Sequence, residues 1–64
     1  MKARHLRPGM IFRRLSPHPH GWRICLSAEL EEFDLDFVDI ISLRQDGDCV
    51  VWAHFIGTEL EVML

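Results

Sequence analysis

Residues 37–56 read FVDIISLR, QDGD and CVVWAHFI, two apolar segments on either side of a turn, and they decide the fold of this chain. Asp46-Gly47 favours a type I′ turn, which needs positive φ at both central residues. The flanking segments, 37–44 and 49–56, are rich in β-branched and aromatic residues, as strands are. The stretch therefore predicts a β-hairpin.

Outward from this hairpin, other turn signals divide the chain into short segments. The signals are Pro8-Gly9, residues 17–21 and Gly57-Thr58. Between them lie segments of strand length at residues 10–15, 22–28 and 58–64. With the two arms of the hairpin, the punctuation predicts five strands.

Alternation of apolar and polar residues predicts one buried face for two of these segments. Residues 58–64 place Leu60, Val62 and Leu64 on one parity. Residues 22–28 place Trp22, Ile24, Leu26 and Ala28 on one parity, so Cys25 is expected to face the other way. In residues 10–15 the apolar residues fall on both parities, and the buried face stays open.

The predicted fold class is mostly β, a five-stranded small barrel or a strongly bent antiparallel sheet. Apolar residues alternate from Phe33 to Phe37 and then change parity at Val38, which predicts a bulge near that point. One short helical turn near residues 28–33 is compatible with this pattern. The whole chain, 1–64, is expected to form a single small β domain.

Composition favours a folded, cytoplasmic protein. Hydrophobic residues make up 48% of the 64, and the net charge is only −3, so disorder is not expected. There is no apolar stretch of the roughly 20 residues that cross a bilayer, and the first residues do not resemble a signal peptide. Cys25 and Cys49 are expected to be reduced, because a small secreted domain usually carries more bridges.

The stretch LRPGMIF at residues 6–12 resembles the first turn and strand of Src-homology-3-like small barrels. Five strands with an Asp-Gly hairpin also suit that class. In length and style the chain is similar to short accessory proteins of bacteriophages and prophages. Residues 7–27 also resemble the N-terminal half of messenger-cleaving toxin ribonucleases, which are considerably longer domains.

Chemistry-bearing residues are few and do not form a known motif. Those able to bind zinc are His18, His20, Cys25, Cys49 and His54, and their spacing matches no closed zinc module. A Gly-rich phosphate loop, a nucleophile elbow and a metalloprotease signature are all missing from the sequence. We therefore expect no enzymatic activity, no metal and no cofactor.

Charge is strongly polarised along the chain. Six basic residues precede the first acid: Lys2, Arg4, Arg7, Arg13, Arg14 and Arg23. One hypothesis makes them a nucleic-acid-binding surface that contacts phosphates. In the other, folding pairs them with the acidic remainder as surface ion pairs. The acidic stretch 29–39 is interpreted as a solvated strand face or loop, with mimicry of a phosphate backbone as the alternative.

A surplus of apolar residues in 49–56 predicts an interface. This segment is apolar on both parities, whereas a strand of a small barrel has only one inward face. If Val51, Ala53 and Phe55 fill the core, other apolar side chains stay outside, and the reverse assignment exposes Phe55. The residues predicted to bind a partner are Trp52, Val50, Ile56 and, from the other arm of the hairpin, Ile41.

These patterns predict a non-catalytic protein-binding module, an adaptor or inhibitor of the kind that phages or mobile elements encode. Its partner is expected to be another protein or a second copy in a homodimer, with no membrane involved. The alternative is a small nucleic-acid-binding barrel that uses the basic N-terminal third.

Overall fold

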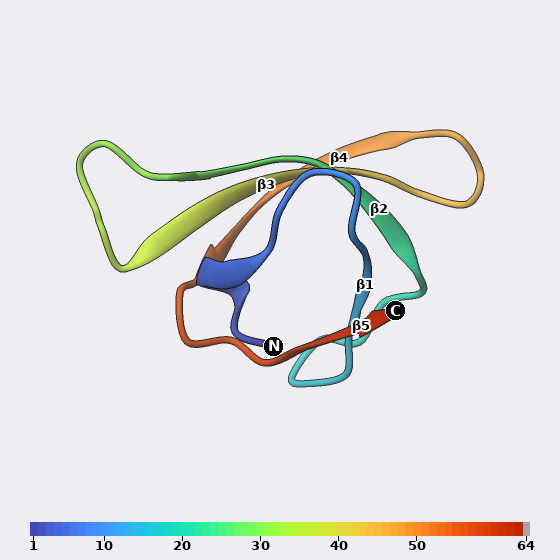
Figure 1. Cartoon of the computed structure of the whole chain (residues 1–64), viewed down its shortest axis with the longest axis horizontal. Coiled ribbons are helices and arrows are strands. Elements are labelled where there is room, and N and C mark those ends of the chain that lie inside the picture. Colours follow the sequence, from blue (N-terminus) through green and yellow to red (C-terminus); the bar gives the residue numbers. More distant parts are fainter. Residues whose placement is uncertain (64) are drawn as a thin grey trace.

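The computed structural model describes residues 1–63 and shows five antiparallel strands in one sheet (Figure 1). The strands are β1 (Ile11–Arg14), β2 (Arg23–Leu30), β3 (Phe37–Leu43), β4 (Cys49–Phe55) and β5 (Leu60–Met63). Their order is β4-β3-β2-β1-β5, so the first four strands form a meander and β5 returns to the free side of β1. The predicted mostly β fold with five strands is confirmed.

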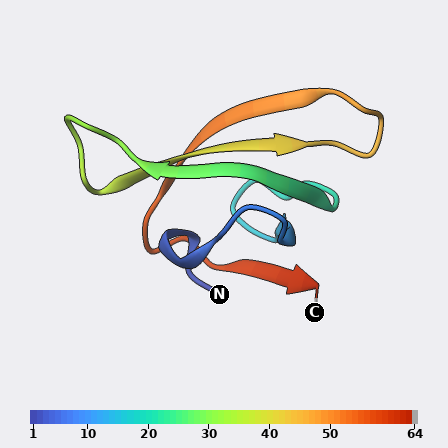
Figure 2. The same cartoon turned by 45° about the horizontal axis from the view of Figure 1, so that its top comes forward.

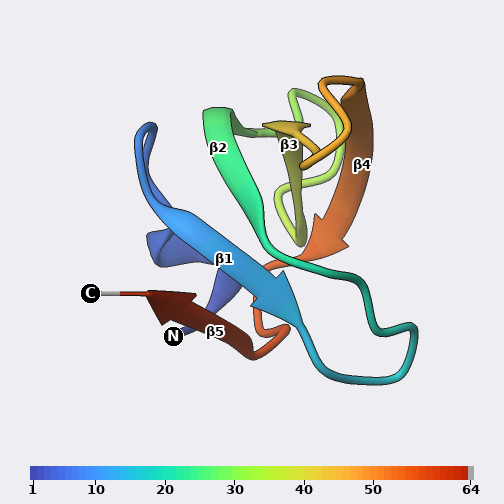
Figure 3. The ribbon, with the colours of Figure 1, turned by 90° about the vertical axis from the view of Figure 1, so that its right-hand side faces the viewer.

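The sheet bends strongly without closing into a barrel, which agrees with the second form of the prediction. Strands β2, β3 and β4 form one layer, and β1 and β5 turn away beneath it (Figures 2 and 3). β4 and β5 are the two edges of the sheet and do not pair with each other. The bend gives the β2–β4 layer a concave face toward β1 and a convex face on the opposite side.

Between the layers lies a small core of seven buried residues. They are Ala3, Leu6, Phe12, Cys25, Val38, Ile40 and Leu60. Phe12 is the largest of them, which settles the open question of which face of the first strand is buried. The predicted inward parity of the last strand is confirmed at Leu60 and Val62, while Leu64 lies outside the described residues.

The only helix in residues 1–63 is the short 3-10 helix η1 (Ala3–His5), and it covers one open end of the bent sheet. Ala3 donates its backbone N–H to the carbonyl of Thr58 at 2.8 Å, and Arg4 donates to Ile56 at 3.2 Å. The helical turn considered for residues 28–33 does not form. Residues 28–30 continue β2, where Leu30 pairs with Val38, and residues 31–33 belong to the loop that follows. Nothing in residues 1–63 forms a helix long and apolar enough to cross a membrane.

A bulge is present, but in β2 rather than at the predicted position in β3. The register with β3 shifts between Cys25 and Ser27, so Leu26 is an extra residue. Cys25 and Ala28 therefore both face the core, although they are three residues apart. The predicted parity of β2 is wrong at Cys25, which is buried, whereas Ile24 and Leu26 are exposed.

Residues 31–36, whose alternation resembled a strand, form a loop between β2 and β3. The Asp34 side chain accepts a hydrogen bond from the N–H of Asp36 at 3.1 Å, and its carbonyl accepts one from Phe37. These local bonds turn the chain before β3 begins. Phe33 at the tip of the loop is almost fully exposed.

The predicted hairpin of β3 and β4 is confirmed, with a different turn. Gly47 has a φ of 94°, whereas Asp46 does not have a positive φ, which excludes a type I′ turn. Gly47 donates its N–H to Arg44 at 3.0 Å, and Arg44 donates to Asp48 at 2.8 Å. This is a turn closed by a left-handed glycine, a second common solution for a hairpin.

Candidate functional site

Two surfaces of the sheet are candidates for function, and the first is its convex face. The register pairs Ile41 with Val51, and Phe37 with Phe55, on the side away from the core. The rings of Phe37 and Phe55 meet edge to face, with centroids 6.2 Å apart. Val51 is 70% exposed and Phe55 53% exposed.

The convex face extends across three neighbouring strands. Its apolar residues are Ile24 of β2, Phe37, Ile41 and Leu43 of β3, and Val51, Ala53 and Phe55 of β4. Across β1, β2 and β3, a shallow groove of about 200 Å³ is lined by the apolar side chains of Ile11, Trp22, Ile24 and Leu43 together with Arg23, Arg44 and Gln45. The face is therefore a broad apolar surface with one hollowed end.

Acidic residues occupy the other end of the convex face. Glu29 of β2 lies directly opposite Asp39 of β3. Hydrogen bonding with Asp39, together with the nearby carboxylates, raises the pKa of Glu31 above its usual range. Like charges in such positions repel each other, so this end disfavours an acidic neighbour.

The residues predicted to bind a partner do not share one face. Ile41 lies on the convex face, but Trp52 and Val50 alternate onto the concave face, opposite Ile40 and Ser42. Ile56 follows β4, is half-buried and donates its N–H to Asp36 at 2.9 Å.

The structure thus adopts the reverse assignment of residues 49–56, with Phe55 and Val51 outside. Sequence parity could not choose, because both parities of this segment are equally apolar. The inward parity contains His54, which is only 2% exposed.

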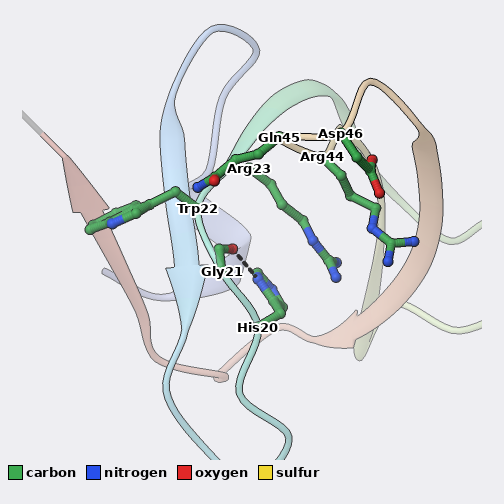
Figure 4. A pocket seen from close by; sticks show the side chains of 7 residues that line it. All are labelled: His20, Gly21, Trp22, Arg23, Arg44, Gln45 and Asp46. Carbon is green, nitrogen blue, oxygen red and sulfur yellow. Dashed lines mark hydrogen bonds between the residues drawn. The ribbon is translucent and has the colours of Figure 1, made fainter.

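The second candidate is a basic hollow at the mouth of the concave side. It has a volume of about 440 Å³ and is lined by His20, Gly21, Trp22, Arg23, Arg44, Gln45 and Asp46. In Figure 4 the side chains of Arg23, Arg44 and His20 extend toward the same space, whereas Trp22 is directed away from it. The guanidinium of Arg13 lies over the Trp22 ring, 4.7 Å from its centroid.

Beside the basic hollow, Trp52 lies among cations. The guanidinium carbons of Arg14 and Arg23 are 5.8 and 5.9 Å from the centroid of its ring. Distances of this size allow cation–π attraction. The ring of His54 lies 5.8 Å from the same Trp52 ring.

His20 and His54 share an unusual environment. Nδ1 of His20 lies 2.7 Å from the carbonyl oxygen of Gly21, and Nδ1 of His54 lies 3.3 Å from that of Trp52. Both Nε2 atoms are buried without a hydrogen-bond partner in residues 1–63. Burial, with a smaller effect of neighbouring cations that include Arg14 and Arg23, lowers the pKa of both rings below 6.5.

This environment makes stability depend on pH. Because both folded-state pKa values are below the usual 6.5, the unfolded chain binds protons first as pH falls. The histidine contribution is complete above about 6.5 and is lost below it, so in a chloride buffer we expect the free energy of unfolding to decline as the pH falls below about 6.5. Urea denaturation at several pH values measures this. His54→Gln should flatten the decline, and an unchanged slope would contradict it.

The six basic residues predicted as a nucleic-acid surface are not brought together. Lys2 pairs with Glu59 at 2.9 Å and Arg13 with Glu61 at 2.9 Å, as the ion-pair interpretation expects. Both pairs are exposed, so water and salt screen them and they contribute little to stability. Arg4 and Arg7 stay beside η1, with an N–H of Arg7 donated to the Arg4 carbonyl.

Of the six, Arg14 and Arg23 alone flank Trp52. Arg44, which no sequence pattern indicated as a site residue, joins Arg23 in the basic hollow. Its position depends on how the hairpin turn approaches residues 20–23 in the folded chain, which no local pattern shows.

The remaining reactive side chains are dispersed. Within residues 1–63, no three His, Cys, Asp or Glu residues lie close enough together to hold a metal ion. Cys25 and Cys49 are both free, one buried and the other exposed. Burial raises the pKa of the Cys25 thiol, which weakens it as a nucleophile.

Comparison with protein-family models, with curated proteins and with solved structures finds no match to this chain. The convex face and the basic hollow are therefore interpreted from their own geometry and chemistry.

Proposed function

We propose that this chain is a non-catalytic protein-binding module that docks through its convex face. The observation that carries the proposal is the run of exposed apolar side chains on three adjacent strands, Ile24, Ile41, Val51 and Phe55. Monomeric soluble proteins rarely expose a large contiguous apolar surface without a function for it. Completing the burial of Val51 and Phe55 would contribute roughly 1 kcal/mol each.

The partner in this proposal is a second copy of the chain. The centre of the convex face, around Ile41 and Val51, carries no charge, so two such faces can pack against each other without unpaired ions. The acidic end sets the orientation, because a parallel arrangement would place Glu29 and Asp39 of both copies together. An antiparallel, two-fold arrangement separates these clusters and gives one self-complementary interface.

Strand β4 offers additional contacts at the same interface. It is an edge of the sheet and its sequence, CVVWAHF, contains neither proline nor a charged residue. Edge strands of natural proteins usually carry such residues to block pairing with another chain. Their absence supports a partner beside β4 as well as over the convex face.

The wider role proposed is that of an adaptor or inhibitor, comparable to the short phage accessory proteins that the sequence resembles. The five short strands and the strongly bent sheet support the likeness to Src-homology-3-like small barrels. Binding without catalysis also suits the thin core and the dispersed reactive side chains of residues 1–63. As an adaptor, the dimer would bind a foreign protein through the part of the convex face that the second copy does not cover.

Sedimentation equilibrium of the intact chain over a concentration series tests the proposal. We expect the apparent mass to rise from that of one chain toward that of two as concentration increases through the micromolar range. High salt should strengthen association or leave it unchanged, because the contact is apolar. A single-chain mass at every concentration, up to the solubility limit, would refute self-association through this face.

A further inference from the structure

The basic hollow has no part in the proposed docking function. Arg23 of β2, Arg44 of the hairpin turn and His20 of the loop before β2 extend into it from separate segments (Figure 4). Arg14 and Arg23 lie beside the same Trp52 ring, which places a third guanidinium close by. Folding thus gathers cations that are up to thirty positions apart in the sequence.

These cations form no ion pairs within the described part of the chain. Across residues 1–63, no carboxylate forms a salt bridge with Arg14, Arg23 or Arg44, whereas Lys2 and Arg13 are both paired. Asp46 is the one acid that lines the hollow. Burial and the proximity of Arg44 lower the pKa of Arg23, as expected for a cation with a like-charged neighbour. The cluster therefore favours an anion.

The two histidines supply a second, independent observation. A carbonyl oxygen only accepts hydrogen bonds, so the Nδ1 atoms beside Gly21 and Trp52 carry the protons of the neutral rings. Each buried Nε2 is then an acceptor with no donor. His54 is 2% exposed, and an unpartnered polar atom at such burial costs stability. Protonation gives each ring a positive charge, which favours an anion in the adjoining hollow.

The geometry points to a phosphate-binding site in the basic hollow, contacted by Arg23, Arg44 and His20, with Arg14 and His54 behind them. Planar guanidinium groups match the oxygens of phosphate and bind them with paired hydrogen bonds. The His20 ring is held in place by edge-to-face packing on Phe12, with centroids 5.6 Å apart. A hollow of about 440 Å³ also leaves room for a group attached to the phosphate.

Bound phosphate should couple to proton uptake. Both histidine rings face the cations Arg14 and Arg23, and His54 also faces His20. A bound anion offsets the repulsion between these cations and a protonated ring. The histidine pKa values should therefore rise on binding, and by linkage the anion should bind more tightly as pH falls toward 5.5, about one unit below the usual histidine value. Sulfate, which keeps both charges over this range, separates the titration of the protein from that of phosphate.

NMR titration of the histidine ring protons of the intact chain tests the site, with inorganic phosphate, sulfate and adenosine 5′-monophosphate as probes. Chloride at equal ionic strength is the reference. We expect saturable shifts of His20 and His54 with phosphate, and tighter binding of sulfate at lower pH. Equal affinity for phosphate and adenosine monophosphate indicates a site for the phosphate alone, and tighter binding of the nucleotide indicates that its attached group also contacts the hollow.

Matched variants identify the residues responsible. Arg23→Gln and Arg44→Gln should each weaken phosphate binding about tenfold or more, because each removes charge-assisted hydrogen bonds. Arg4→Gln, which removes an equal charge beside η1, should leave affinity within about twofold. Shifts that chloride reproduces, or three variants weakened equally, would overturn the proposal. Dispersed amide spectra for all three variants show that they remain folded.

Discussion

Replacement of Phe12 by alanine is expected to unfold most of the chain. Phe12 is completely buried and is the largest of the seven core residues. Removing a buried phenylalanine costs about 3–5 kcal/mol. A domain of this size has a total stability toward the low end of the usual 5–15 kcal/mol, so the loss consumes most of it.

Circular dichroism with urea denaturation measures this effect. Phe33→Ala is the matched control, because Phe33 is 96% exposed at the tip of the loop between β2 and β3. It should change the free energy of unfolding by less than about 0.5 kcal/mol. A cooperative Phe12→Ala variant with nearly unchanged stability would show that the space between the two layers is not the core.

The second large effect is expected for Val51→Asp, which should abolish self-association while the fold persists. Val51 is 70% exposed in the single chain, so the aspartate stays hydrated there. At an interface the same carboxylate would be buried without a partner, which costs several kcal/mol. We expect the association constant to fall at least a hundredfold, measured by sedimentation equilibrium.

Phe33→Asp is the control for this variant, since it places the same charge at an exposed apolar position outside the convex face. It should associate as the natural chain does. Equal loss of association in both variants would implicate net charge rather than the convex face.

Much of the fold was predictable because turn chemistry and strand composition are local. The Asp46-Gly47 hairpin and the inward parity of Leu60 and Val62 agree with the structure. Cys25 was placed on the wrong face because one extra residue, Leu26, shifts the register of β2. A bulge leaves no distinct pattern in a strand whose two faces are both partly apolar.

The candidate sites were harder to predict, for a tertiary reason. Val50 and Val51 are equally apolar, and only the pairing with β3, which sets Val50 opposite Ser42 and Val51 opposite Ile41, determines which of them turns inward. Trp52 was therefore expected at the partner interface, whereas it lies on the concave face beside Arg14. Nor could the sequence show that some basic residues pair with acids while others stay unpaired, because that depends on which strands become neighbours.

Neighbouring residues on opposite faces provide the most direct test of the proposed docking surface. A dilution series of the natural chain, followed by methyl NMR, reports on Val50 and Val51 separately. Because Val51 lies on the convex face and Val50 on the concave face, we expect concentration-dependent shifts at Val51 and Ile41, with Val50 and Ile40 unchanged. Shifts confined to Val50 and Ile40, or no shifts at any concentration, would contradict it.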